Sequence, residues 1–340
     1  MNVSFIFGNG FDINLGMKTS YVDFYNWYIK NKDEYFARVI KNDMKSGINI
    51  WADLELELGV FTERLDSKSI EVYLDEKVNL EVSLGEYLSE QCEAFKKDYA
   101  LLGKGFREAV AGFYTHMDEK ARSEFKNYIA NVHGAIEYNF ITLNYTDTLQ
   151  KVYNESLKVL KPELVHVTNT GRICRDKFSE PLYLHGRIDD NDGIILGVGS
   201  ETQIANDKFR IMNGCAEYLI KQSVNEKSGA RLIQKAKQII DGSQYICVFG
   251  ASIGATDVML WEYIGKWIMG NKDRRLILFM RDAHIKKGSR QHLVQKKDEY
   301  KKLFIERSNI PTEQVDICKS RIVVCLNSKV FELENYDGGL

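Results

Sequence analysis

The chain has 340 residues, of which 44% are hydrophobic and 28% are charged, and only three are proline. This length allows one large domain or two with a sizeable core, and the composition is typical of a soluble globular protein. A formal net charge of −2 excludes a general attraction to nucleic acid or anionic lipid, so any such contact must come from a local patch.

The cysteines indicate a reducing compartment. They form no Cys-x-x-Cys pair, so we expect reduced thiols and no structural zinc or other metal site. We see no signal peptide and no apolar run long enough to span a membrane, which predicts a cytoplasmic protein without membrane contact.

The first predicted strand, Val3 to Phe7, runs into a glycine-rich loop. Gly8 and Gly10 bracket Asn9, and Gly16 follows before a polar lead-in to a helix. Glycines at such a place let backbone N–H groups approach a phosphate. The alternative is a turn that only changes the direction of the chain.

Helical patterns dominate as far as residue 135. Aromatic residues from Tyr21 to Tyr28 recur at helical spacing, which favours a core-facing stripe over base stacking, and the segment from Trp51 to Leu65 favours a helix over an alternating strand. Residues 84–130 predict two long helices broken near Gly103 to Gly105. We therefore expect a mainly helical insertion over residues 20–135, packed beside or over the glycine loop.

Polar residues collect where the second predicted strand, 138–143, ends. Ligands of parallel sheets bind outside the carboxyl ends of strands, so Thr142, Asn144 and Asp147 are candidates for nucleotide contacts. Asp147 is also open to interpretation as the cap of the following helix.

Further strands and helices alternate along the rest of the chain. His185 ends one predicted strand and is either structural or catalytic, and a Gly250-Ala-Ser252 turn with Asp257 follows the clearest buried strand. The lysine-rich segment 286–302 is interspersed with acidic residues, which favours a solvated helix face over a nucleic-acid contact. The predicted strands lie at 164–168, 181–187, 194–199, 244–249, 275–280 and 321–326, and the predicted helices are two within 202–241, one at 258–268 and one at 293–305.

This alternation predicts one continuous α/β domain over residues 1–340, with a doubly wound, mostly parallel sheet and the helical insertion within it. Four strand-end features would meet at one edge of that sheet. They are Gly8-x-Gly10 with Gly16, Asn144 with Asp147, His185-Gly186, and Gly250-Ala-Ser252 with Asp257.

Four motifs together resemble the AbiH family of bacterial phage abortive-infection proteins, over most of the chain. They are GNGFD-x-x-LG-x-x-T-x-Y from Gly8, the Trp51-Ala-Asp-Leu-Glu stretch, FITLNYTDTL from Phe140 and FGASIG-x-x-D from Phe249.

AbiH-like sequences are in turn related to the sirtuin-like NAD-binding fold. In that pattern Gly8, Gly10 and Gly16 match the opening glycines, Asn144 and His185-Gly186 match the strand-end Asn and His-Gly, and Gly250 with Ser252 matches the later Gly-x-Ser. The chain departs from the pattern in having Asn144-x-x-Asp147 where sirtuins have Asn-x-Asp. It also lacks the zinc-binding cysteine pairs that accompany protein deacylation.

The resemblance implies an NAD-consuming effector, which would cleave the bond between nicotinamide and C1′ of its ribose. Asn144 would hold the ribose hydroxyls or position water, and His185 would act as general base or orient the same hydroxyls. Asp12 would bond ribose or water, unless it forms an Asx turn in the loop.

Three hypotheses follow. The first is an antiphage effector that hydrolyses NAD and is restrained by the helical insertion or by homo-oligomerisation until a phage-derived trigger acts. The second is a non-catalytic nucleotide sensor or interaction module, and the third is a nucleic-acid-directed enzyme that uses the lysine-rich segment.

Overall fold

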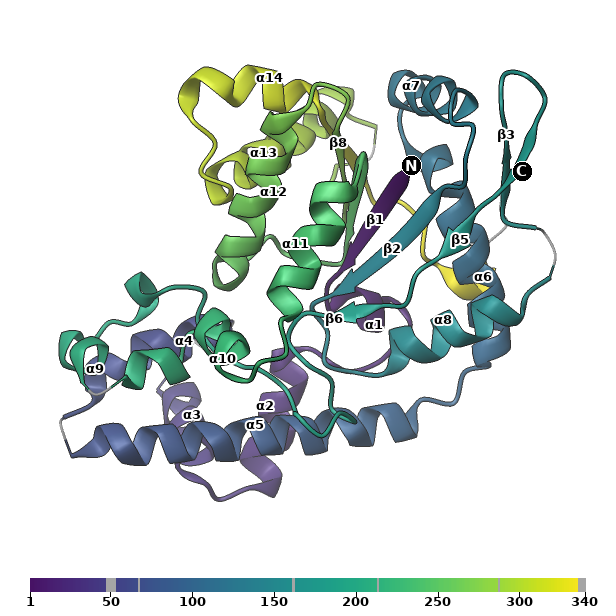
Figure 1. Cartoon of the computed structure of the whole chain (residues 1–340). Coiled ribbons are helices and arrows are strands. Elements are labelled where there is room, and N and C mark those ends of the chain that lie inside the picture. Colours follow the sequence, from purple (N-terminus) through teal and green to yellow (C-terminus); the bar gives the residue numbers. More distant parts are fainter. Residues whose placement is uncertain (47–52, 67, 161–162, 213, 287, 336–340) are drawn as a thin grey trace.

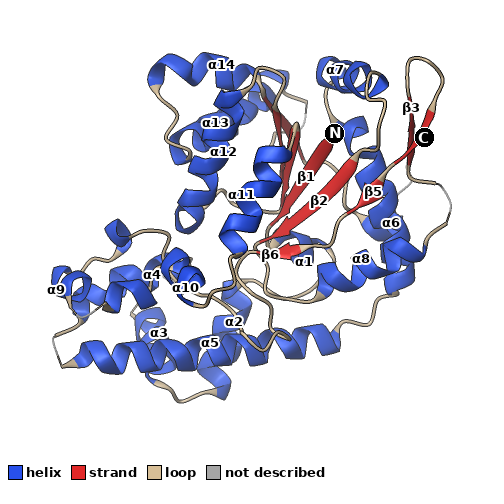
Figure 2. Ribbon diagram, in the orientation of Figure 1, coloured by secondary structure: helices blue, strands red, loops and turns tan. Residues whose placement is uncertain are grey.

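A computed structural model describes residues 1–46, 53–66, 68–160, 163–212, 214–286 and 288–335. At its centre is a seven-stranded sheet in which every strand pairing is parallel, in the order β5-β2-β1-β7-β8-β9, with β6 also pairing with β2 (Figure 2). The prediction of a mixed α/β fold with a mostly parallel sheet is confirmed. The strands are β1 (Asn2–Phe7), β2 (Glu137–Thr142), β5 (Lys177–Phe178), β6 (Leu182–Tyr183), β7 (Tyr245–Phe249), β8 (Arg275–Met280) and β9 (Ile322–Leu326).

The central strand β1 is an almost continuous apolar run because both of its faces are buried. Phe5 and Phe7 point into one hydrophobic cluster, whereas Ile6 points into another. Phe5 lies opposite Phe140 of β2 and Cys247 of β7. Since side chains alternate along a strand, this register brings three strands into one core on each face.

Helices pack against both faces of the sheet, as Figure 1 shows. One face is covered by α6 (Tyr99–Gly112), α7 (Glu119–Ala130) and α8 (Thr148–Lys158). The other is covered by α11 (Leu232–Gly242), α12 (Val258–Gly270), α13 (Arg290–Arg307) and α14 (Val315–Ser320).

A second group of helices shares a separate hydrophobic cluster and lies at the end of the sheet to which the arrows of β1 and β2 point (Figure 1). Residues 99–130, by contrast, pack on the sheet, so the predicted insertion over 20–135 does not pack as one unit. The helices of this group are α2 (Tyr21–Asn31), α3 (Tyr35–Lys45), α4 (Leu54–Phe61), α5 (Ser69–Ala94) and α9 (Asp207–Ile211).

The predicted helix break at Gly103 to Gly105 is wrong. The chain leaves the helix between Ala94 and Tyr99, and both glycines lie inside α6. A Cβ on Gly103 would lie 2.6 Å from the Cβ of Glu155, and one on Gly105 would lie 2.1 Å from the carbonyl oxygen of Leu333. These glycines therefore allow close packing of neighbouring segments.

Several short apolar runs adopt other structures than predicted. Residues 164–168 contribute β3 (Val165–Val167), which pairs antiparallel with β4 (Ile173–Arg175) in a separate two-stranded sheet. Residues 194–199 form no strand; Leu196 and Val198 are buried in the cluster of the second helix group instead. The first helix predicted within 202–241 is divided between α9 and α10 (Lys221–Lys227), whereas α11 is continuous.

The remaining predicted helices are present. Trp51 and Ala52 lie outside the described residues, and α4 begins at Leu54. The lysine-rich segment forms most of α13, where Lys296 pairs with Glu299 at 2.7 Å, in agreement with a solvated face; Lys287 lies outside the described residues. None of the described helices is a candidate for a membrane span.

Candidate functional site

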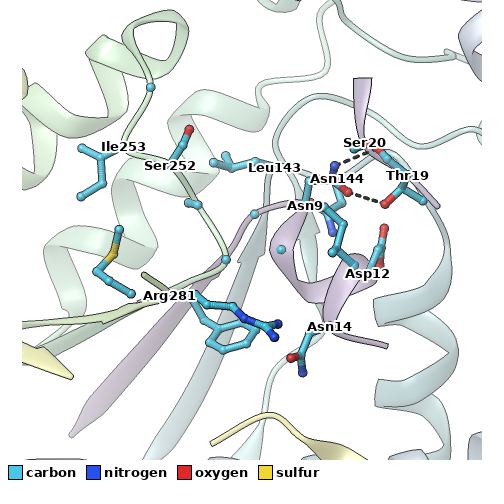
Figure 3. A pocket seen from close by; sticks show the side chains of 18 of the residues that line it. Asn9, Asp12, Asn14, Thr19, Ser20, Leu143, Asn144, Ser252, Ile253 and Arg281 are labelled. Carbon is cyan, nitrogen blue, oxygen red and sulfur yellow. Dashed lines mark hydrogen bonds between the residues drawn. The ribbon is translucent and has the colours of Figure 1, made fainter. Parts of the chain in front are cut away.

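The carboxyl ends of β1, β2, β7 and β8 open into a pocket of about 1160 Å³. On one side of β1 the sheet continues with β2, and on the other side with β7, β8 and β9, so the chain changes direction across the sheet at β1. Such a switch point leaves a crevice between the loops that follow the two neighbouring strands. Figure 3 shows side chains from several of these loops around the pocket.

Two glycine loops cross at this switch point. A Cβ on Gly8 would lie 2.6 Å from the Cα of Ala251, and one on Gly10 would lie 2.5 Å from the Cα of Gly250. Gly250 has a φ of +68°, which favours glycine. The N–H groups of Gly8 and Gly10 donate to the carbonyl oxygens of Phe249 and Gly250, at 2.9 and 2.8 Å.

This pairing corrects the expectation that those two N–H groups face an anion. Both are already used to join the loops after β1 and β7, so a phosphate in the pocket needs other donors. The glycines still line the pocket, and their role there is to let two loops approach closely enough to form its floor.

Most of the predicted site residues come together in this pocket, but three do not line it. Gly16, with φ +89°, ends the turn after α1 (Gly10–Asn14), and Thr142 is fully buried and accepts the N–H of Asn144 through its hydroxyl, at 3.1 Å. Asp147 pairs with Lys151 at 2.8 Å and makes no side-chain cap for α8. The predicted residues that do line the pocket are Gly8, Asn9, Gly10, Asp12, Asn144, His185, Gly250, Ser252 and Asp257.

Asn9 holds the loop that precedes α2. Its amide nitrogen donates to the carbonyl oxygen of Thr19 at 2.8 Å, and its amide oxygen accepts the Thr19 hydroxyl at 2.6 Å, as the dashed lines in Figure 3 show. Ser20 then caps α2 by accepting the N–H of Asp23. The spacing of the opening motif is thus explained by a loop that closes on itself beside the pocket.

Asp12 is a buried carboxylic acid with one unbonded oxygen. Its Oδ2 accepts the Thr146 hydroxyl at 2.6 Å rather than a backbone N–H of its own loop, which differs from the Asx-turn alternative. Oδ1 is buried without a hydrogen-bond partner among the described residues. Burial raises the pKa of Asp12 to about 7, although Thr146 and Asn144 act in the opposite direction.

Asn144 is buried beside Asp12, with 4% of its surface exposed. Neither its amide oxygen nor its amide nitrogen has a hydrogen-bond partner among the described residues. An unbonded buried amide is costly, and native structures rarely leave one unless water or a ligand satisfies it. The amide of Asn144 and Oδ1 of Asp12 therefore form a pair of unused polar groups at the pocket.

His185 and Asp257 form a largely buried dyad that also lines the pocket. The Nε2 atom of His185 lies 2.9 Å from Oδ1 of Asp257, and 7% of the histidine is exposed. Gly186 follows with φ +77°, where a Cβ would lie 2.2 Å from the carbonyl oxygen of Gly193, so the chain turns sharply after the histidine. When Nε2 donates to the carboxylate, Nδ1 keeps its lone pair and can accept a proton.

Lys221, at the start of α10, joins the dyad to the second helix group. Its Nζ donates to Oδ1 of Asp257 at 2.7 Å and to Oε2 of Glu55 at 2.8 Å, while the Tyr145 hydroxyl donates to Oε1 of Glu55 at 3.0 Å. Burial alone would raise the pKa of Asp257, but Lys221 and His185 hold it well below its ordinary value. Burial lowers the pKa of Lys221, but the two carboxylates outweigh this and raise it.

The loop after β7 carries a strained residue next to Ser252. Ile253 has φ +55° although it is β-branched, and only 1% of it is exposed. Such a conformation costs on the order of 1–3 kcal/mol and tends to occur where the surroundings fix a functional loop. Among the described residues, no group of three or more His, Cys, Asp or Glu side chains is placed to hold a metal ion.

Residues 4–279 match the sequence model of a family described as "Bacteriophage abortive infection AbiH". This chain belongs to the AbiH family. The family implies a role in phage abortive infection. No curated protein matches the chain.

The AbiH motifs contain several residues that line the pocket or belong to the hydrogen bonds around Glu55, and the search for polar residues at strand ends did not identify them. Glu55 and Asp53 belong to the Trp51-Ala-Asp-Leu-Glu stretch, and Tyr145 and Thr146 belong to FITLNYTDTL. Their presence in those motifs was a usable signal. Lys221 lies in none of them.

Proposed function

We propose that this AbiH protein binds NAD in the strand-end pocket and hydrolyses it to nicotinamide and ADP-ribose. The bond between N1 of nicotinamide and C1′ of ribose breaks, and its electron pair neutralises the positively charged ring. A water oxygen forms the new bond to C1′, and one proton is released. Loss of a central cofactor would halt the infected cell, in keeping with the abortive-infection role that the family implies.

The pair of unused polar groups at Asn144 and Asp12 is the observation that carries the proposal. Both side chains are buried, both line the pocket, and neither the amide nor Oδ1 of Asp12 has a partner among the described residues. Ribose hydroxyls both donate and accept hydrogen bonds, so they could satisfy the amide and the carboxyl together. Groups fixed in this way would hold C1′ in place for attack.

The dyad supports a role for His185 as the general base. With a neutral histidine, the side chains of Glu55, Lys221, Asp257 and His185 carry a net charge of −1, so a proton taken up by His185 brings the buried group to neutrality. The carboxylate of Asp257 fixes the ring and would stabilise the imidazolium. The same negative charge would favour the positive charge that develops on the ribose in an oxocarbenium-like transition state.

The second helix group would act as a lid in this proposal. Tyr21 of α2, Glu55 of α4 and Leu88 of α5 line the pocket opposite the strand ends. A lid would close over bound substrate and exclude bulk water. It would also give the protein a place where a phage-derived trigger or a second copy could relieve restraint. We place the protein in the cytoplasm, and a sirtuin-like, doubly wound NAD-binding fold without the zinc module is part of the same proposal.

Product analysis in ¹⁸O-labelled water tests the proposal. Purified protein is incubated with NAD, with and without phage lysate, and the mixture is analysed by mass spectrometry. We expect free nicotinamide and ADP-ribose carrying one ¹⁸O atom at C1′. If NAD stays intact under both conditions while it still binds, the hydrolase proposal fails and a nucleotide-sensing module takes its place.

A further inference from the structure

Arg281 is a cation at the pocket whose side chain has no partner among the described residues. It follows directly after β8 and lines the pocket, and Figure 3 shows its guanidinium reaching toward Asn14. No hydrogen bond or ion pair of its side chain is found within the part of the chain that the structure describes. The other lysine or arginine that lines the pocket, Lys329, lies 3.6 Å from Glu332.

The backbone around Arg281 is held in place by Asn327. The Asn327 side chain accepts the N–H of Asp282 at 2.8 Å and donates to its carbonyl oxygen at 2.9 Å, while the Asn327 N–H donates to the carbonyl of Met280 at 2.8 Å. Asn327 has φ +51°, a conformation that asparagine tolerates. Asn327 therefore holds the backbone on both sides of Arg281, so the backbone of Arg281 is fixed while its side chain is free to bind a ligand.

The charged groups that line the pocket differ between its two ends. Asp12 and Asp257 lie near the ends of β1, β2 and β7, and Arg281 lies at the end of β8. Two carboxylates also line the pocket at the β8 end, but each has a lysine of its own: Asp282 lies 3.8 Å from Lys296, and Glu332 lies 3.6 Å from Lys329. From β2, which Asn144 follows, to β8 there are three strand spacings, or about 14 Å. A ligand that reaches both ends must be longer than a nucleoside.

We infer that Arg281 binds the phosphates of a dinucleotide whose positively charged nicotinamide end lies at the carboxyl groups near Asn144. This inference rests on the proposed function and assigns the orientation of the substrate. An arginine suits phosphate because its planar guanidinium can form two parallel charge-assisted hydrogen bonds. It also supplies donors that the loop N–H groups of Gly8 and Gly10, already bonded, do not. Arg281 lies beyond the residues that match the family.

Binding of ADP-ribose and of adenosine, measured by calorimetry, tests the inference. Arg281→Gln should weaken ADP-ribose binding at least about tenfold, equivalent to about 1.4 kcal/mol, and should change adenosine binding less than about twofold. The affinity of the variant for ADP-ribose should also depend less on salt concentration. Arg307→Gln, which removes an exposed arginine from the end of α13, is the matched control and should bind both ligands as the wild type does.

Unchanged affinity of Arg281→Gln for ADP-ribose, or no binding of ADP-ribose by the wild type, would overturn the inference. Failure of the hydrolase proposal would give another result. NAD would stay intact, but Arg281→Gln would still bind ADP-ribose more weakly than the wild type does. If NAD is hydrolysed, the variant should raise KM at least about tenfold and leave kcat within about threefold, because Arg281 is remote from the bond that breaks.

Discussion

Replacing Asp12 with asparagine should stabilise the protein relative to the wild type, and this gain should be larger at alkaline than at acidic pH. Burial raises the pKa of Asp12 from an ordinary value of 3.8 to about 7 in the folded state. Between these two values the unfolded chain binds fewer protons than the folded one, so wild-type stability falls as pH rises from about 4 to 7. A shift of about 3 pKa units corresponds to about 4 kcal/mol.

Asp12→Asn keeps the size of the side chain and an oxygen for the Thr146 hydroxyl, but it cannot ionise. For a chain of this length, about 4 kcal/mol corresponds to a difference of about 5 °C in Tm. Because the wild type has lost about 2 of these 4 kcal/mol by pH 5, the gain in Tm of the variant over the wild type should be about 3 °C larger at pH 8 than at pH 5 in thermal unfolding. Asp192→Asn, on an exposed turn, controls for the loss of any carboxylate. An equal difference in Tm at both pH values would refute the reasoning.

Three further outcomes can be checked with single substitutions. Asn144→Ala should lower nicotinamide release at least about 100-fold and leave Tm nearly unchanged, since its amide has no hydrogen bond among the described residues to lose; a large fall in Tm would show a structural role. Lys221→Met should destabilise the fold by about 3–5 kcal/mol in urea unfolding, because two buried carboxylates lose their shared cation; a neutral effect would contradict this. Gly10→Ala should destabilise by about 1–3 kcal/mol, whereas Gly85→Ala, in open space on α5, should stabilise by up to about 1 kcal/mol. Similar effects of the two glycine substitutions would argue against a tight loop crossing.

The buried parallel strands could be predicted because their composition is a local signal. β1, β7 and β8 lie between two layers of helices, so each reads as an apolar run that ends at glycine or a polar residue. Short segments such as 194–199 carry the same composition but are buried by helices instead. Their structure depends on which distant helices pack on them, and no local sequence pattern reveals this.

The candidate site divides in the same way. Asn144 and His185 could be found because each follows a strand, and parallel strands end at one edge of a sheet. Lys221 could not, because its meaning comes from Glu55, 166 residues away, and from Asp257. The use of the Gly8 and Gly10 N–H groups was also hidden, since a glycine is equally suited to a phosphate and to a second loop.

The most direct test of the proposed chemistry compares NAD hydrolysis by the wild type, Asn144→Ala, His185→Ala and Arg307→Gln under one condition, with equal folding verified by Tm. The account predicts nicotinamide release by the wild type and Arg307→Gln, and almost none by the two pocket variants. Release at the wild-type rate by Asn144→Ala and His185→Ala would contradict it, because the bond would then be broken without the groups that line the strand-end pocket.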